Sequence, residues 1–263
     1  MPSHTTRIIT LDGPEALAFA HAQFSSDVLS LPVGQWQWSA WLDPKGRVKA
    51  LLQVARVAGE TLHAVARGGD VEAIASDLRR FIFRTRVSIR VSGPCHVADG
   101  DAHDDYSAHI DDDVLVFGEG DASLRVGDAT RPDASDAWLA RHITKGFAWL
   151  PDEAVATLVP PALSMERLGA VAFAKGCFPG QEIAARLHFL GGHKKHLRVV
   201  TSAAPLAAGQ TLRNVDRDIG IVLMTACVNG APTSLVVLDD AAVQAETLET
   251  VDGRLHVSST FDA

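Results

Sequence analysis

Cysteine is scarce in this sequence. The 263 residues include three cysteines, Cys95, Cys177 and Cys227, which stand 82 and 50 positions apart. Without a CxxC pair, the chain lacks the ligand spacing of an ordinary zinc site or of a four-cysteine cluster held by one chain. In a reducing compartment the three thiols are expected to be free. Each is then either a small buried apolar residue or a reactive group.

Positive charge and long apolar runs are also lacking. Acidic residues outnumber Lys plus Arg by 32 to 24, which gives a net charge of −8. A field of this sign repels nucleic acid and anionic membranes, so we expect neither as a partner. No stretch approaches the roughly 18 apolar residues of a membrane span, and the first residues lack the apolar run of a signal peptide. We therefore expect a cytoplasmic protein.

The histidines do not compensate for the missing metal ligands. His96, His103 and His109 lie in or beside an acidic stretch, residues 99–113. Their spacing fits no pair of histidines one helical turn apart, which is the common arrangement on a metal-binding helix. We predict no metal site.

The apolar patterning that is present predicts an α+β fold. A hairpin over residues 36–57 is expected to turn at Asp43-Pro44-Lys45-Gly46. Asp12 and Asp70 are each placed to cap a helix, the second with an apolar face that runs through residue 82. Residues 162–168 suggest a short helix and residues 171–174 a strand. Strand-like runs after Gly191-Gly192 predict a small C-terminal β-barrel or sandwich, so we divide the chain into residues 1–195 and 196–263.

The segment around Cys177 has the residues of a sharp turn followed by a helix. Gly176 and Gly180 bracket the cysteine, and Pro179 is placed as a first-turn residue. A thiol there would lie at the positive end of the helix, with Lys175 two residues away, and both favour the reactive thiolate. We predict that Cys177 is a nucleophile or a metal-touching thiol. The alternative is a small buried residue at a tight strand–helix junction.

The other two cysteines have different surroundings. Cys95 and Cys227 lie in strand-like stretches with no neighbouring cation and no helix start. Nothing there favours a thiolate. We expect them to pack in the core or at a sheet edge and assign them no chemistry.

Three segments resemble a known family. Residues 175–186, KGCFPGQEIAAR, are similar to the KGC(Y/F)xGQE signature of the YgfZ/GcvT folate-binding family. Residues 23–28, QFSSDV, are similar to its early segment, although Ser26 replaces the usual Asn and is assigned no pterin contact. Residues 41–47, WLDPKGR, are similar to its DPKGR hairpin. The resemblance implies three interlocked subdomains around a central channel for the pteridine, with the small β-barrel at the C-terminus.

The resemblance also implies a function. Members of the YgfZ branch bind tetrahydrofolate and serve iron–sulfur enzymes, so we expect an accessory protein that helps assemble or repair iron–sulfur clusters. Cys177 would be its functional residue, in transient contact with a cluster of a client or assembly protein. The alternative is a folate-dependent aminomethyltransferase or related one-carbon transferase. Lys49-Ala50-Leu51 stands where the glycine-cleavage enzyme has an acidic pair, which argues against turnover. A third alternative is a module that acts through protein contacts alone.

Seven residues are expected to contact the folate. Trp138 can stack on the pterin or benzoyl ring, or anchor a core helix. Lys194 and Lys195 can bind the glutamate tail, or belong to a solvated loop. Gln181 and Glu182 can hydrogen-bond the pterin, or cap the helix. The predicted set is Trp138, Lys175, Gln181, Glu182, Arg186, Lys194 and Lys195.

Overall fold

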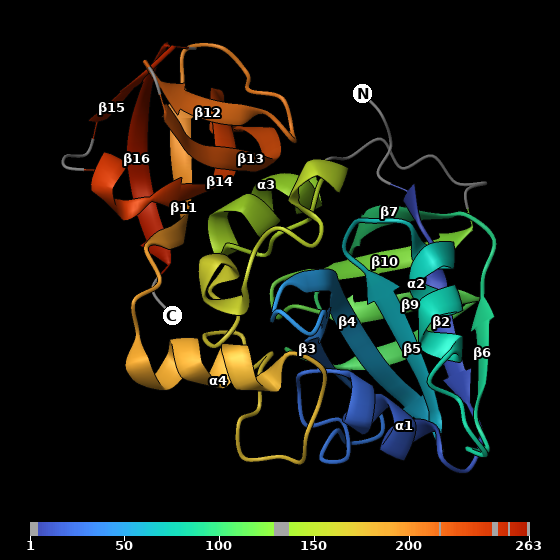
Figure 1. Cartoon of the computed structure of the whole chain (residues 1–263). Helices are drawn as coiled ribbons and strands as arrows, with labels where there is room; N and C mark the ends of the chain where they lie inside the picture. The colour runs from blue at the N-terminus through green and yellow to red at the C-terminus, as the bar shows by residue number, and fades with distance from the viewer. Residues whose placement is uncertain (1–4, 129–136, 216, 244–246, 252, 262–263) are drawn as a thin grey trace.

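Three antiparallel sheets organise the chain (Figure 1). The structure is a computed structural model that describes residues 5–128, 137–215, 217–243, 247–251 and 253–261. The first sheet has the order β3 (Gln35–Leu42), β4 (Val48–Ala58), β5 (Thr61–Ala66), β2 (Ile8–Asp12) and β6 (Ser88–Val91). The second has the order β1 (Thr5–Thr6), β7 (Cys95–Gly100), β10 (Ser123–Asp128), β9 (Val114–Gly118) and β8 (Ala108–Asp111).

The two faces of the first sheet pack into different cores. Side chains alternate between the faces of a strand, and in β3 this alternation sends Trp36 and Trp38 to one core and Trp41 to the other. Helices α1 (Ala16–Gln23) and α2 (Val71–Arg79) contribute to the core around Trp41. The start of α2 is fixed by Asp70, whose carboxylate accepts hydrogen bonds from two backbone N–H groups of the first turn.

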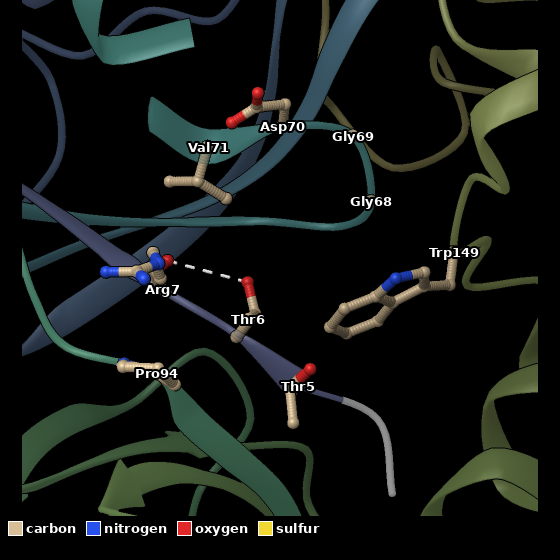
Figure 2. A pocket seen from close by; sticks show the side chains of 9 residues that line it. All are labelled: Thr5, Thr6, Arg7, Gly68, Gly69, Asp70, Val71, Pro94 and Trp149. Atoms are coloured by element: carbon tan, nitrogen blue, oxygen red, sulfur yellow. Dashed lines mark hydrogen bonds between the residues drawn. The ribbon is translucent and has the colours of Figure 1, made fainter. Parts of the chain in front are cut away.

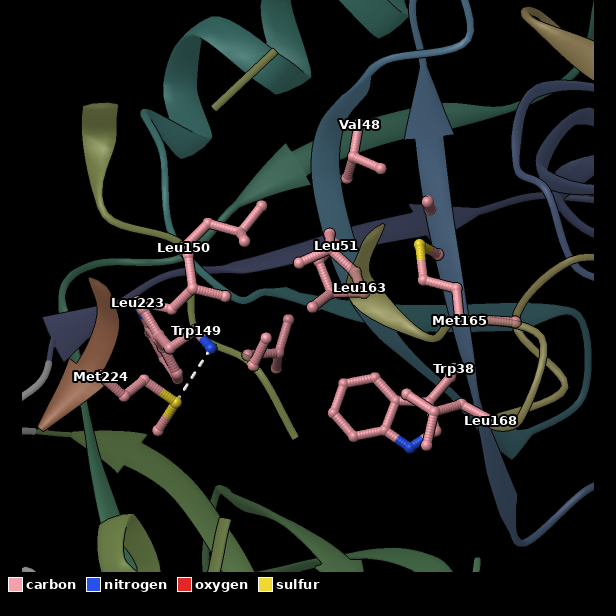
Figure 3. Close-up of a cluster of buried hydrophobic side chains, with 14 of the residues drawn as sticks. Trp38, Val48, Leu51, Trp149, Leu150, Leu163, Met165, Leu168, Leu223 and Met224 are labelled. Carbon is pink, nitrogen blue, oxygen red and sulfur yellow. Dashed lines mark hydrogen bonds between the residues drawn. The ribbon is translucent and has the colours of Figure 1, made fainter. Parts of the chain in front are cut away.

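A central core joins all three sheets. It includes Trp38 and Leu51 of the first sheet, Leu115 of the second and Met224 of the third. Figure 3 shows part of this core, where the backbone N–H of Trp149 donates to the Met224 sulfur at 3.1 Å. Burying one large apolar side chain stabilises a protein by about 1.5–3 kcal/mol, so this core ties the three sheets together.

The third sheet nearly closes on itself. Its order is β12 (Thr211–Asn214), β13 (Arg217–Val228), β14 (Ala231–Asp239), β11 (Lys195–Ser202), β16 (Gly253–Phe261) and β15 (Thr247–Thr250). Beyond β15, the Val251 N–H donates to the Arg213 carbonyl of β12 at 3.0 Å, so the first and last strands come together. The sheet surrounds a core of its own, formed by residues such as Val222 and Leu255. The predicted barrel-like C-terminal unit is confirmed, while the division at residue 195 stays a prediction.

Two more helices are seen in Figure 1: α3 (Ala137–Lys145) in the middle of the molecule, between the third sheet and the other two, and α4 (Gln181–Leu190) at its lower left. Helix α3 lies beside the third sheet, and α4 follows the turn that carries Cys177. Three short 3₁₀ helices complete the described elements: Asp152–Ala154, Pro160–Leu163 and Asp240–Ala242. Of the helices that the structure describes, none has both the length and the apolarity to cross a membrane.

Some sequence predictions of local structure are wrong. Asp12 caps no helix: it ends β2 and accepts a hydrogen bond from the Thr61 hydroxyl at 2.6 Å, whereas α1 starts four residues later, at Ala16, with Glu15 as its N-cap. Residues 171–174 form no strand: one backbone hydrogen bond, from the Ala172 N–H to the Ser25 carbonyl, links them to the 23–28 segment, and a turn begins at Phe173. The helix expected over residues 162–168 is a 3₁₀ turn that ends at Ser164, which is left-handed.

Candidate functional site

The three motif segments meet at the turn before α4. The Lys175 ammonium donates to the backbone carbonyls of His21, Phe24 and Ser26, the last at 2.9 Å. The first two carbonyls belong to the C-terminal end of α1, where the helix dipole favours a cation. Burial lowers the pKa of Lys175 to about 8. Lys175 therefore fastens the turn to the 23–28 segment.

The DPKG hairpin supports the same turn from another side. Gly180 has φ 75°, and a Cβ atom there would stand 2.5 Å from the Asp43 carbonyl oxygen and 3.0 Å from the Leu42 Cβ. Only glycine adopts this conformation and permits this approach without strain. A Cβ on Gly46 would in turn stand 2.9 Å from the Ile183 side chain. The hairpin and the start of α4 are therefore in backbone-level contact.

Cys177 is exposed on this anchored turn. Its neighbour Phe178 is buried in the central core, so the thiol stands outside while the next side chain holds the turn down. Helix α4 begins at Gln181 with Gly180 as its N-cap, later than predicted, so Pro179 precedes the helix. The thiol therefore lies further from the helix start than the sequence suggested. Like Cys177, the other two cysteines are free; Cys95 is buried, whereas Cys227 is exposed.

The predicted folate contacts are not gathered in one place. Trp138 is 1% exposed and packs against Trp149, with ring centroids 5.8 Å apart. The Gln181 amide lies 3.5 Å from the Lys175 carbonyl. The remaining residues are exposed, on α4 or at the start of β11: Glu182, Arg186, Lys194 and Lys195. Their roles toward a folate stay predictions.

A buried arginine occupies the junction between the first sheet and α3. Arg67 is fully buried, and its guanidinium donates to the Gln53 side chain, to the carbonyls of Phe147 and Ala148, and to His142 Nδ1 at 2.9 Å. Its Cζ also lies 4.7 Å from the centroid of the Trp149 ring. Burial lowers the pKa of Arg67 to about 9, so it stays charged at neutral pH.

Glu119 balances this charge through His142. Because arginine can only donate, His142 Nδ1 accepts from Arg67, and Nε2 therefore carries the proton. That Nε2–H donates to the Glu119 carboxylate at 2.8 Å, and Arg141 Nε donates to it at 3.1 Å. Burial acts to raise the pKa of Glu119, but the hydrogen bonds from His142 and Arg141 and the charge of Arg141 lower it to about 2. The result is an ionised, hydrogen-bonded cluster in the interior.

A cavity of about 330 Å³ opens beside this cluster (Figure 2). Gly68-Gly69, next to Arg67 in the chain, form one wall, and the Trp149 ring faces across from them. Polar groups at its edge come from Thr6, Arg7 and Asp70. Gly68 can have no side chain, because a Cβ would stand 1.9 Å from the Leu150 carbonyl oxygen.

A second cavity, of about 380 Å³, lies beside the cysteine turn. Trp41, Lys49, Phe81 and Pro179 are among its lining residues, together with Asp43 and Asp77. Pro179 is two positions from Cys177, so a lining residue of this cavity is closer in sequence to the thiol than any lining residue of the first cavity. None of the eight residues predicted for the site lines either cavity.

Sequence reasoning missed the buried cluster. Arg67, Glu119 and His142 come from three distant segments, and an arginine before Gly68-Gly69 has the sequence appearance of an exposed loop residue. The one available signal was the position of His142, one helical turn after Trp138, which places both side chains on the same face of α3.

Comparison with known proteins places this geometry in context. No family model matches the chain. The tRNA-modifying protein YgfZ of Klebsiella pneumoniae is 26% identical over an alignment of length 229, and the match covers 75% of this chain and 69% of that protein. YgfZ of Vibrio vulnificus (strain YJ016) is 24% identical over an alignment of length 237, and the match covers 81% of this chain and 73% of that protein.

Solved structures give the same relation at the level of the fold. The glycine cleavage system aminomethyltransferase T from Bartonella henselae aligns with a TM-score of 0.75 and 17% identity, and the match covers 98% of this chain and 83% of that one. At this identity the match shows a shared fold. Together, the YgfZ relatives and the aminomethyltransferase fold confirm the resemblance of this chain to the YgfZ/GcvT family.

Proposed function

We propose that the chain is a cytoplasmic, tetrahydrofolate-binding accessory protein that supports the assembly or repair of iron–sulfur clusters, with the Cys177 thiol as its reactive group. The observation that carries this proposal is the exposed thiol on a turn fastened by Lys175 and Gly180, in a chain related to YgfZ. A thiolate is a soft ligand that suits iron. One cysteine leaves the other ligands to a client or assembly protein.

The cavity in Figure 2 fits the chemistry of a folate. A pterin is a flat ring with an edge of N–H donors, which a carboxylate such as Asp70 can accept, and its face can stack on an indole such as Trp149. Arg7, at the same cavity, can pair with a carboxylate of the glutamate tail. When bound, tetrahydrofolate would supply a carrier for one-carbon units. The chain's residues would bind and orient it.

Asp70→Asn is expected to weaken tetrahydrofolate binding by about tenfold or more, because a charged acceptor is replaced by a neutral amide. Asn is as good an N-cap as Asp, so α2 is retained. Calorimetric titration with tetrahydrofolate measures the change. The matched control is Asp77→Asn in the second cavity, which should leave the affinity unchanged. If Asp77→Asn weakened binding and Asp70→Asn did not, the folate site would be the second cavity, beside the cysteine turn.

Cys177→Ser is expected to leave the fold intact and to abolish rescue of iron–sulfur enzyme activity in a strain that lacks the protein. Serine has nearly the size of cysteine, but its hydroxyl lacks the nucleophilicity of a thiolate and its affinity for iron. Cys227→Ser, which changes another exposed thiol, serves as the control and should rescue fully. Full rescue by Cys177→Ser would remove this thiol from the mechanism.

The contacts of Lys49 argue against the alternative of an aminomethyltransferase. The Lys49 ammonium pairs with Asp77 at 2.7 Å and lies 4.2 Å from the centroid of the Trp41 ring. A cation therefore stands in the segment where that enzyme carries its acidic pair. This segment therefore supplies no carboxylate for methylene transfer.

A further inference from the structure

The connection between α2 and β6 exposes aromatic rings among arginines. Phe83 is 77% exposed and Phe81 50%, whereas most large apolar side chains of the first sheet are buried. The segment 79–86, RRFIFRTR, has four arginines in a chain whose net charge is −8. Large exposed rings cost free energy in water, so a cluster of them points to a binding surface.

One residue of this connection has an unusual backbone conformation. Arg84 has φ 58°, a conformation that is unfavourable for a side chain of this kind. Its guanidinium lies 5.2 Å from the centroid of the exposed Phe83 ring, and with the described residues it forms no ion pair. Strain of this kind persists where the surrounding structure imposes it and is concentrated at functional sites.

The second cavity adjoins this connection. Phe81 and Trp41 stand nearly perpendicular in its wall, with ring centroids 6.3 Å apart. Lys49 and Arg80 bring positive charge to the cavity, and the Arg80 side chain is 79% exposed. The hairpin turn that borders it adds two exposed cations, Lys45 and Arg47. The whole surface is thus a hollow with the exposed Phe81 ring in its wall and cations around it, next to the exposed ring of Phe83.

Two acidic residues in the cavity cancel only part of this charge. The Asp77 carboxylate is occupied by Lys49 at 2.7 Å and Arg80 at 3.6 Å. The Asp43 carboxylate accepts from two backbone N–H groups of its own turn, at Lys45 and Arg47. Among the residues that the structure describes, Arg47 and Arg84 form no ion pair, so these two cations are left to face solvent.

We propose that this surface, the phenylalanine–arginine surface (Trp41, Lys45, Arg47, Lys49, Arg80, Phe81, Phe83, Arg84), binds a single-stranded nucleic acid. One base would enter the second cavity, another would stack on Phe83, and the cations would contact the phosphates between them. Bases stack on aromatic side chains whatever their sequence, and phosphates require cations. An acidic peptide could pair with the cations, but it has no flat ring beside each negative charge that could stack on the exposed aromatic side chains. The net charge predicted no nucleic-acid partner, but the local charge here has the opposite sign.

The test is fluorescence anisotropy with a labelled 12-nucleotide oligouridylate at low salt. We expect binding that weakens steeply as salt is raised, because phosphate contacts release counterions. Phe83→Ala should weaken binding by at least about fivefold through the loss of one stacked base. Arg84→Glu should weaken it as well. The control, Arg254→Glu, changes an exposed arginine on β16 and should have no comparable effect. A matching oligodeoxythymidylate shows whether the ribose hydroxyl contributes.

Heparin separates stacking from charge, because it is a polyanion without bases. Phe83→Ala should leave heparin binding unchanged while it weakens oligonucleotide binding. The proposal would be overturned if Phe83→Ala weakened heparin binding and oligonucleotide binding equally. It would also be overturned if the oligonucleotide did not bind at about 50 mM salt, or if polyglutamate at matched charge competed fully with it. Circular dichroism checks that Phe83→Ala is folded, which its exposure leads us to expect. Because tetrahydrofolate is assigned to the other cavity, its binding is measured independently.

Discussion

Arg67→Met is expected to destabilise the protein by about 3–5 kcal/mol, since it removes one partner of a buried ionic cluster. The variant fills a similar volume, but the carbonyls of Phe147 and Ala148 and the Gln53 side chain lose their donor. The ionised Glu119 carboxylate also loses a buried positive charge that stabilises it. The free energy of unfolding from urea titration gives the measurement.

A matched control separates this effect from the loss of any arginine. Arg213 pairs with Asp218 at 2.7 Å on the surface of the C-terminal sheet, and its side chain is 61% exposed. Arg213→Met should change stability by less than about 1 kcal/mol, the usual worth of an exposed ion pair. If both variants lost the same amount, the buried cluster would have no special part in holding α3 to the first sheet.

The Arg67 cluster also explains why Trp138 is buried. Arg67 Cζ lies 5.9 Å from the centroid of the Trp138 ring and 5.4 Å from that of Trp38. The guanidinium thus fills the centre of a group of indoles that come from different segments. A ring so enclosed contributes packing, and any folate contact by Trp138 would require this packing to open.

Local signals in the sequence predicted much of the fold. Asp70 caps α2 as expected, and the hairpin turns at Asp43, whose carbonyl accepts from Gly46. Asp12 has the same residue type and spacing as a cap, yet the Thr61 hydroxyl takes its carboxylate. The difference is a tertiary contact across 49 positions, which the sequence around Asp12 does not record.

The candidate site was predicted in part. The motif segments around residues 25, 45 and 177 were each recognised, but their contact depends on glycines and backbone carbonyls, as at Gly180 and Asp43. Lys175 was expected to influence the thiol, whereas its ammonium is held by carbonyls at the end of α1. Backbone partners of this kind have no sequence signature, and so the direction of a long side chain could not be predicted.

Acidification is expected to destabilise the protein from about pH 6.5 downward. Burial, and next the charge of Arg67, lower the pKa of His142 from 6.5 to about 4. Between these values the unfolded chain binds more protons than the folded one, so stability falls as the pH falls. The full loss from His142 amounts to about 3 kcal/mol and is reached near pH 4. Glu119, whose pKa is lowered from 4.5 to about 2, continues the loss below pH 4.5.

His142→Gln tests the origin of this loss. Glutamine can still donate to Glu119 but takes up no proton, so its free energy of unfolding should fall less than that of the natural chain between pH 6.5 and 4.5. Burial also lowers the pKa of His63, which adds a loss of the same sign that both proteins share. His256→Gln, at an exposed position on β16, should follow the natural chain. Parallel curves for the natural chain and His142→Gln would show that His142 does not carry the acid sensitivity. In that case the Arg67 guanidinium would move away from Nδ1 when the His142 imidazole takes up a proton. The cluster would then be less rigid than its hydrogen bonds imply.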